Sequence, residues 1–190
     1  MEKIICIEQQ IEEVLNVFNK LKCENLKKGM YRIHGELEYK VTLPEVIRGK
    51  YQIEIIVTKE FPCELPIVKE VGGDIPKGFH KNTDEILCLG VETEIRIFLK
   101  NNPNLLEFIK SFVIPYFYSF KIWQRTGLVP FGERTHGSEG IVEFYKEYLF
   151  LKDTKTVLNV LKYTYEERKI NKYHNCPCRK WKKYISLCAL

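Results

Sequence analysis

A cysteine, a histidine and an asparagine lie within nine positions of one another in a polar stretch, as His80, Asn82 and Cys88. A cysteine thiolate can attack an acyl group and carry it as a thioester. An asparagine amide beside it can hold the loop or donate a hydrogen bond to the oxyanion of the tetrahedral intermediate. The histidine can act as a base, or bond the backbone and shape the loop. Leu87 and Leu89 flank the cysteine and are expected to anchor it.

The same residues also fit a structural interpretation, a half-buried cysteine beside a loop histidine, because free cysteine is among the residue types most often buried. A peptidase is disfavoured. His80 and Asn82 precede Cys88 in one short loop, which leaves no evident partners for a Cys-His-Asn triad. Acyl transfer through Cys88 and simple packing both stay open on spacing alone.

The elements that must position this loop come before it in the chain. Apolar residues at three- and four-residue spacing predict an amphipathic helix over residues 8–22. Alternating apolar residues predict strands over 31–43 and 51–58, with a short third strand over 66–69. The first half is therefore expected to be a helix, an antiparallel meander and a long loop that carries Cys88.

Helices dominate the expected second half. Apolar spacing predicts helices over residues 105–120, 141–151 and 154–169, and Pro115 should kink the first of these or end its first part. Together with the meander, this predicts an α+β fold with helices around one antiparallel sheet.

A glycine-rich loop over residues 127–140 contains the polar residues Glu133 and His136. One interpretation folds this loop over the Cys88 groove, where it would supply a polar group to the reaction. The alternative is a structural turn in which His136 caps a helix that begins near Ser138.

Composition favours an ordered, largely one-domain protein. The 190 residues are 45% hydrophobic and 13% aromatic, enough for a core. A net charge of +5 is compatible with an acidic partner, but a nucleic-acid partner is not expected because strong basic clustering is absent. Acidic residues interrupt the N-terminal apolar positions, so no signal peptide is expected, and no run is long enough for a membrane span. A cytoplasmic location follows as an expectation.

The motif over residues 49–66, G-x-Y-x-I-x-I-x-x-x-x-x-F-P-x-x-x-P, is followed by H-x-N at 80–82 and I-L-C-L at 86–89. This order resembles the ubiquitin-conjugating enzymes, in which a helix, a meander, a Tyr-Pro or Phe-Pro turn, a His-Pro-Asn motif and a Cys-Leu site run through one domain. The resemblance covers roughly residues 8–120. It implies a UBC-like domain over residues 1–125, followed by a loop and helical extension over 126–170 and a tail over 171–190.

The resemblance also implies an activity. Cys88 would accept the C-terminus of a ubiquitin-like protein from an activating enzyme as a thioester, then transfer it to an amine of a target protein. Asn82 would support the oxyanion or the loop, and His80 would shape the site. No cofactor is expected for this step, because ATP is used upstream. The alternative is the same fold without transfer activity, as a binding module for a ubiquitin-like protein.

Three departures from the family pattern indicate a divergent member. Lys81 stands where the family has proline, the gap from Asn82 to Cys88 is shorter than in familiar eukaryotic members, and the tryptophan expected after the cysteine is missing. These features and a Lys-, Ile- and Asn-rich composition favour the bacterial ubiquitination-like pathways that serve antiviral defence. Such pathways pair a conjugating enzyme with an activating enzyme, a ubiquitin-like protein and a metalloprotease.

The tail carries a second candidate site, with Cys176, Cys178 and Cys188, and His174 nearby. It resembles the small zinc motif at the C-terminus of the preprotein translocase ATPase. Zinc prefers four nitrogen or sulfur ligands, and Ala189 stands at the fourth ligand position, so the motif is degenerate. Either these three thiols and the imidazole hold a structural zinc, or the tail binds nothing. Seven cysteines without a secretory signal make a disulfide framework unexpected.

Overall fold

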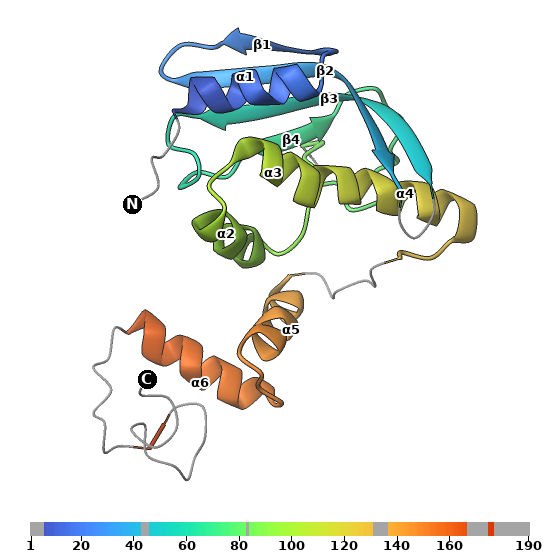
Figure 1. Cartoon of the computed structure of the whole chain (residues 1–190). Coiled ribbons are helices and arrows are strands. Elements are labelled where there is room, and N and C mark those ends of the chain that lie inside the picture. Colours follow the sequence, from blue (N-terminus) through green and yellow to red (C-terminus); the bar gives the residue numbers. More distant parts are fainter. Residues whose placement is uncertain (1–5, 43–45, 83, 131–136, 167–174, 177–190) are drawn as a thin grey trace. The chain divides into compact units, whose positions relative to one another are not determined.

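A computed structural model of the chain describes residues 6–42, 46–82, 84–130, 137–166 and 175–176. The chain forms two compact units, residues 1–133 and 134–190. The first unit contains an antiparallel sheet and the helices packed on it, which makes it α+β (Figure 1). It also carries the loop with Cys88.

Helix α1 runs over Ile7–Val17 and packs by a narrow apolar stripe, with Ile7, Ile11 and Val14 buried. It is shorter than the predicted helix over residues 8–22. Leu21 instead begins strand β1, Leu21–Asn25, which pairs with the next strand along its whole length. The backbone pairing of these residues overrides their helical spacing.

The sheet has four strands in sequence order, each antiparallel to the next. Strand β2, Met30–Val41, and strand β3, Ile47–Thr58, pair over all twelve of their residues, and β4, Ile67–Glu70, pairs with the second half of β3. Every second residue from Tyr51 to Val57 is buried, the period expected of a strand with one face on the core. The predicted meander is confirmed, with β1 as an additional strand.

A run of helices lies against one face of this sheet, and α2, Glu92–Asn101, lies farther from the strands (Figure 1). Helix α2 comes first, followed by α3, Leu105–Phe108, a π-helical turn η1, Ile109–Val113, and α4, Ile114–Thr126. The last three follow one another without a break. Pro115 stands in the first turn of α4, directly after the π-helical turn, where a missing N–H is tolerated, so the α-helical part that contains it begins there.

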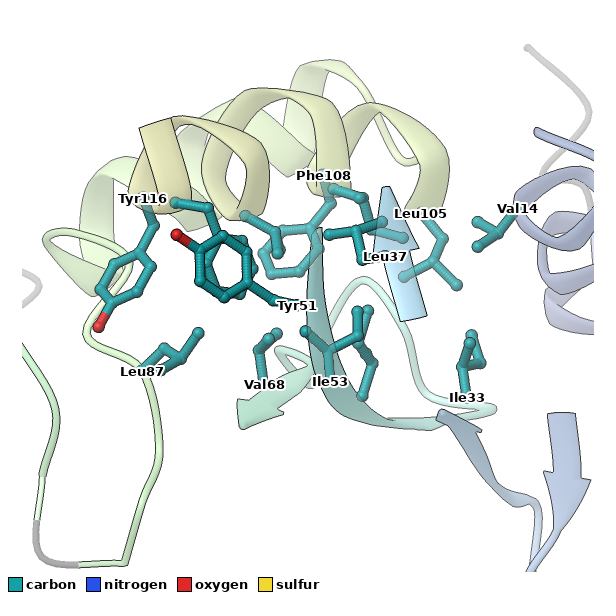
Figure 2. Packing of buried hydrophobic residues seen from close by; sticks show 14 of the residues in the cluster. Val14, Ile33, Leu37, Tyr51, Ile53, Val68, Leu87, Leu105, Phe108 and Tyr116 are labelled. Atoms are coloured by element: carbon teal, nitrogen blue, oxygen red, sulfur yellow. The ribbon is translucent and has the colours of Figure 1, made fainter. Parts of the chain in front are cut away.

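The core lies between the sheet and these helices (Figure 2). Tyr51 from β3 stacks on Phe117 from α4 with ring centroids 4.3 Å apart. At the other end, the buried Gln10 of α1 accepts a hydrogen bond from the Leu105 N–H at 2.8 Å. This bond satisfies one of the backbone donors that a helix N-terminus leaves unpaired. It also joins two elements 95 residues apart in the sequence.

The second unit contains two helices, α5 over Ser138–Tyr148 and α6 over Thr154–Tyr165. Phe144 and Val157 are their buried apolar side chains. Asp153 caps α6 by accepting a hydrogen bond from the Thr156 N–H at 2.8 Å. Among the described residues, no helix is long and apolar enough to cross a membrane.

Candidate active site

Cys88 lies on the second arm of a short hairpin that follows β4. Lys81 and Leu87 face each other as an antiparallel bridge, and the Cys88 N–H donates to the His80 carbonyl at 2.8 Å. The Leu87 N–H donates to the Val68 carbonyl of β4, also at 2.8 Å, so the hairpin is bonded to the sheet. The backbone of Cys88 is thereby fixed beside that of His80.

The thiol of Cys88 points to the surface. Cys88 is exposed, whereas Leu87 before it is 5% exposed and Leu89 after it packs against the core. This alternation is that of an extended strand with one side buried. The two leucines hold the segment down and leave the sulfur accessible, the arrangement that a nucleophile needs to meet a large acyl donor.

Asn82 closes the turn of the hairpin. Its Oδ1 accepts hydrogen bonds from the backbone N–H groups of Asp84, at 3.0 Å, and Ile86, at 2.9 Å. Its own N–H donates to the Ile86 carbonyl at 3.0 Å. The side-chain oxygen of Asn82 therefore supports the loop, as an Asx turn does. Within the described part of the chain, no hydrogen bond occupies its Nδ2 group, which stays able to donate.

His80 shapes the entry to the hairpin. Its φ is +40°, in the left-handed region that side chains other than glycine seldom adopt. Its half-buried ring lies edge-on to Phe79 with centroids 5.0 Å apart, and its carbonyl receives the Cys88 N–H. These contacts place the backbone of His80 directly against the nucleophile candidate.

Lys81 is the main residue of the site that the motif analysis did not assign a role. Its side chain is 3% exposed, and its Nζ lies 3.5 Å from Oε2 of Glu70 and 2.5 Å from Oε2 of Glu85. It also donates to the Ile75 carbonyl at 3.4 Å. A buried ammonium is stable only when it is paired in this way. Lys81 thus joins the turn of the hairpin, through Glu85, and the preceding loop, through Ile75, to the Glu70 carboxylate of β4.

Glu70 completes this network from the end of β4. Its side chain is fully buried, and its two oxygens accept from the N–H groups of Asp74, at 3.2 Å, and Ile75, at 3.3 Å. A Cβ at Gly72 would lie 2.9 Å from Oε1 of Glu70, so glycine leaves room for the carboxylate. The loop over residues 71–75 therefore wraps around Glu70 and presents it to Lys81.

Tyr116 of α4 holds the residue that precedes the hairpin. Its hydroxyl donates to the Phe79 carbonyl at 2.9 Å. Burial raises the pKa of Tyr116, and the negative charge of a Cys88 thiolate raises it further. The phenol therefore stays protonated at neutral pH and holds residue 79, one position before the hairpin.

A contact from α2 fixes the neighbouring Phe-Pro turn. Arg96 donates through Nη1 to the Cys63 carbonyl at 2.8 Å and through Nε to Glu92 at the same distance. Helix α2, which begins four residues after Cys88, is thereby joined to the turn between β3 and β4. The segments on both sides of the thiol are thus anchored.

Of the other predicted site residues, the structure describes only Cys176. Cys176 is described and buried, with 4% of its surface exposed. Among the described residues, no group of three His, Cys, Asp or Glu could hold a metal ion. The zinc site therefore stays a prediction, which metal analysis of the purified chain would test. Five predicted residues lie outside the described parts of the chain: Glu133, His136, His174, Cys178 and Cys188.

The sequence patterns that could have revealed the roles of Lys81 and Tyr116 differ in strength. A lysine four residues before an acidic residue, as in Lys81 and Glu85, is a visible pair in the sequence. Nothing local links Lys81 to Glu70, eleven residues earlier, or Tyr116 to Phe79.

Comparison of the sequence with protein-family models gives no match, and comparison with curated proteins gives no significant one.

Proposed function

We propose that the chain is a divergent ubiquitin-conjugating enzyme in which Cys88 carries a ubiquitin-like protein as a thioester. One observation carries the proposal: an exposed cysteine stands on a hairpin that is held in place by the buried Leu87, the partly buried Leu89, a backbone bond to His80 and a buried ion pair at Lys81. A fixed, accessible thiol suits a nucleophile that must accept an acyl group from one protein and present it to another.

The reaction is two acyl transfers. The Cys88 thiolate attacks the carbonyl carbon of the thioester that joins the ubiquitin-like protein to its activating enzyme. A new C–S bond forms, the old C–S bond breaks, and the activating enzyme leaves as a thiolate. A neutral amine of the target protein then attacks the Cys88 thioester, a C–N bond forms, the amine loses a proton and the Cys88 thiolate is released. The Nδ2 group of Asn82 is the candidate donor for supporting either oxyanion.

The element order supports the same proposal. Helix α1, the four-strand meander and the Cys88 hairpin follow one another in the order of the family that the motifs resemble. Lys81 replaces the proline of that family, and its buried ion pairs can restrain the loop in place of the proline ring. In the pathway we propose, the partners are an activating enzyme, a ubiquitin-like protein, a target protein and an associated metalloprotease, in bacterial antiviral defence.

A charging assay tests the proposal. Wild type, Cys88→Ser and Cys63→Ser would be incubated with ATP, an activating enzyme and its ubiquitin-like protein, then run on a non-reducing gel. Cys63 is the matched control because it is also exposed. We expect a reducible adduct with wild type and Cys63→Ser, and either no adduct or a reductant-resistant ester with Cys88→Ser. A charged activating enzyme that leaves wild type unmodified would refute the enzymatic function.

A non-catalytic binding module is the second candidate, and the bonding of Asn82 favours it. The side-chain oxygen of Asn82 is committed to the turn, as it would be in a loop kept for shape alone. This candidate predicts saturable binding of the ubiquitin-like protein by calorimetry, unchanged in Cys88→Ser, together with no adduct in the charging assay. An adduct would rule it out.

A further inference from the structure

We propose that two copies of this chain associate through strand β1 and join their sheets into one antiparallel sheet, with four strands from each copy. Strand β1 is the outermost strand. It pairs with β2 on one side, and among the described residues no strand or bridge pairs with its other side, named here the β1 edge (Figure 1). Strand β4 and the Cys88 hairpin lie at the opposite end of the sheet, so the proposal does not depend on the function assigned to Cys88.

The hydrogen bonds around β1 fix which of its backbone groups turn toward β2. The Leu26 N–H, directly after the strand, donates to the Met30 carbonyl at the start of β2 at 2.8 Å. Backbone groups alternate between the two sides of a strand, so those of Glu24 and Lys22 also turn toward β2. The remaining residues of β1 must turn their backbone groups the other way.

The backbone groups of Leu21, Cys23 and Asn25 therefore face the β1 edge. The Leu21 N–H donates to the Phe18 carbonyl at 2.9 Å, away from β2, as this alternation requires. Within the described chain, the other groups on this side have no backbone partner: the C=O of Leu21 and the N–H and C=O of Cys23 and Asn25. A row of unpaired donors and acceptors at a sheet edge is a template for a further strand.

Side-chain charge makes the β1 edge complementary to itself. Leu21 is buried on the inner face of the sheet, so Lys22 and Glu24 lie on the outer face. A two-fold axis through Cys23 places Lys22 of each copy directly opposite Glu24 of the other. Lys22 is exposed and forms no ion pair within the described ranges, and Glu24, which pairs with Arg32 at 3.3 Å, keeps 51% of its side chain exposed. Opposite charges in directly opposed positions stabilise strand pairing.

The same axis also matches the hydrogen-bonding groups. It lets the Cys23 N–H of each copy donate to the Cys23 C=O of the other, and the Asn25 N–H donate to the Leu21 C=O. An axis through Lys22 or through Glu24 would instead set two lysines or two glutamates against each other, which disfavours those registers. The sequence of β1 therefore specifies one register for pairing with a second copy.

The strength of this association follows from its size. Strand β1 has five residues, so the interface is small, and contacts of small area are typical of transient complexes. We expect a reversible dimer with a Kd of about 100 µM. High salt should weaken it, because the charges of Lys22 and Glu24 are exposed and are screened by ions.

Sedimentation velocity of the full chain tests the pairing, over about 5 to 500 µM chain, with reductant and about 50 mM salt. We expect wild type to pass from monomer to dimer over this range. Lys22→Glu and Glu24→Lys should each weaken dimerisation at least about tenfold, because each sets like charges against one another. An equimolar mixture of the two variants should dimerise as wild type does, because opposite charges face each other again in the mixed pair. Lys40→Glu is the matched control, since Lys40 is exposed on β2 beyond the residues that pair with β1, and it should behave as wild type.

Cys23→Pro tests the backbone part of the pairing. Proline is tolerated on an edge strand where the missing N–H faces outward, so the variant should keep its circular dichroism spectrum and remain monomeric up to about 500 µM. If it does not fold, the mixture of the two charge variants still decides. A wild-type chain that stays monomeric up to the same concentration would overturn the proposal. So would a dimer that persists unchanged in Lys22→Glu, in Glu24→Lys and in a folded Cys23→Pro, because that dimer would use another surface.

Discussion

Lys81 is the residue whose chemistry differs most from what its position in the motif implies. It stands between His80 and Asn82, where a proline would restrain the backbone by its ring. Lysine instead restrains the loop through its buried ammonium, which bonds Glu70, Glu85 and the Ile75 carbonyl. Because the Lys81 ammonium is nearly sealed from water, this restraint depends on the presence of both carboxylates, Glu70 and Glu85.

Replacing Lys81 by methionine should therefore destabilise the chain by about 3 kcal/mol, because it leaves the Glu70 carboxylate buried without its counter-charge. The double variant Lys81→Met and Glu70→Gln should recover part of this loss. Urea denaturation at pH 7 measures both values. Lys77→Met is the matched control, since its ammonium is largely exposed and should change the free energy of unfolding by less than about 0.5 kcal/mol. Equal stability of Lys81→Met and the control would contradict a structural ion pair.

Asn82→Ala removes the acceptor of the Asp84 and Ile86 N–H groups. Since one such bond contributes about 1 kcal/mol, we expect the Ile86 amide to exchange with deuterium about fivefold to tenfold faster in the variant. Asn101→Ala, at the end of α2, serves as a control that should leave the hairpin amides unchanged. An unchanged rate at Ile86 would show that the turn does not need the side chain of Asn82 and would contradict its supporting role.

At the scale of elements, strong periodic patterns were predictable and contacts between elements were not. The alternation in β2 and β3 and the apolar stripe of α1 were visible in the sequence. Strand β1 was missed because only Leu21 in it is buried, so pairing with β2 and not side-chain pattern makes it a strand. Helix α2 was missed because it is short and buries just Ile95 and Leu99.

The pairing of β1 with β2 depends on Gly35. Its φ is +133°, and a Cβ there would lie 2.4 Å from the Lys20 carbonyl oxygen, which is backbone and cannot move aside alone. Gly35→Ala should therefore destabilise the chain by about 2 kcal/mol or more. Thermal or urea unfolding followed by circular dichroism measures this. Gly78→Ala is the matched control, because a Cβ there meets nothing within 4 Å. If both variants unfold alike, Gly35 is not a steric requirement.

At the scale of the whole molecule, the sequence was sufficient for the α+β class and for a structured loop at Cys88, because those follow from local pattern. It was insufficient for what holds the loop. Glu70 reaches Lys81, and Tyr116 reaches Phe79, only once the sheet and α4 are packed together.

The division into two units gives a prediction about the whole chain. The main hydrophobic cluster lies entirely within the first unit, and the buried Phe144, Val157 and Cys176 belong to the second. A fragment of residues 1–133 keeps the sheet, its helices and the hairpin. It should unfold in one cooperative transition, with a melting temperature within about 5 °C of the corresponding transition in the full chain. Scanning calorimetry of both measures this.

The same fragment also tests which part of the chain is needed for thioester formation. If Cys88 and its hairpin suffice for thioester formation, residues 1–133 should charge in the gel assay as readily as the full chain, because every described contact that fixes the thiol lies within them. A folded fragment that fails to charge, beside a full chain that does, would assign an essential part of the reaction to residues 134–190. His136 would then be the first residue to replace there, and His136→Ala in the full chain should lose charging as the fragment does.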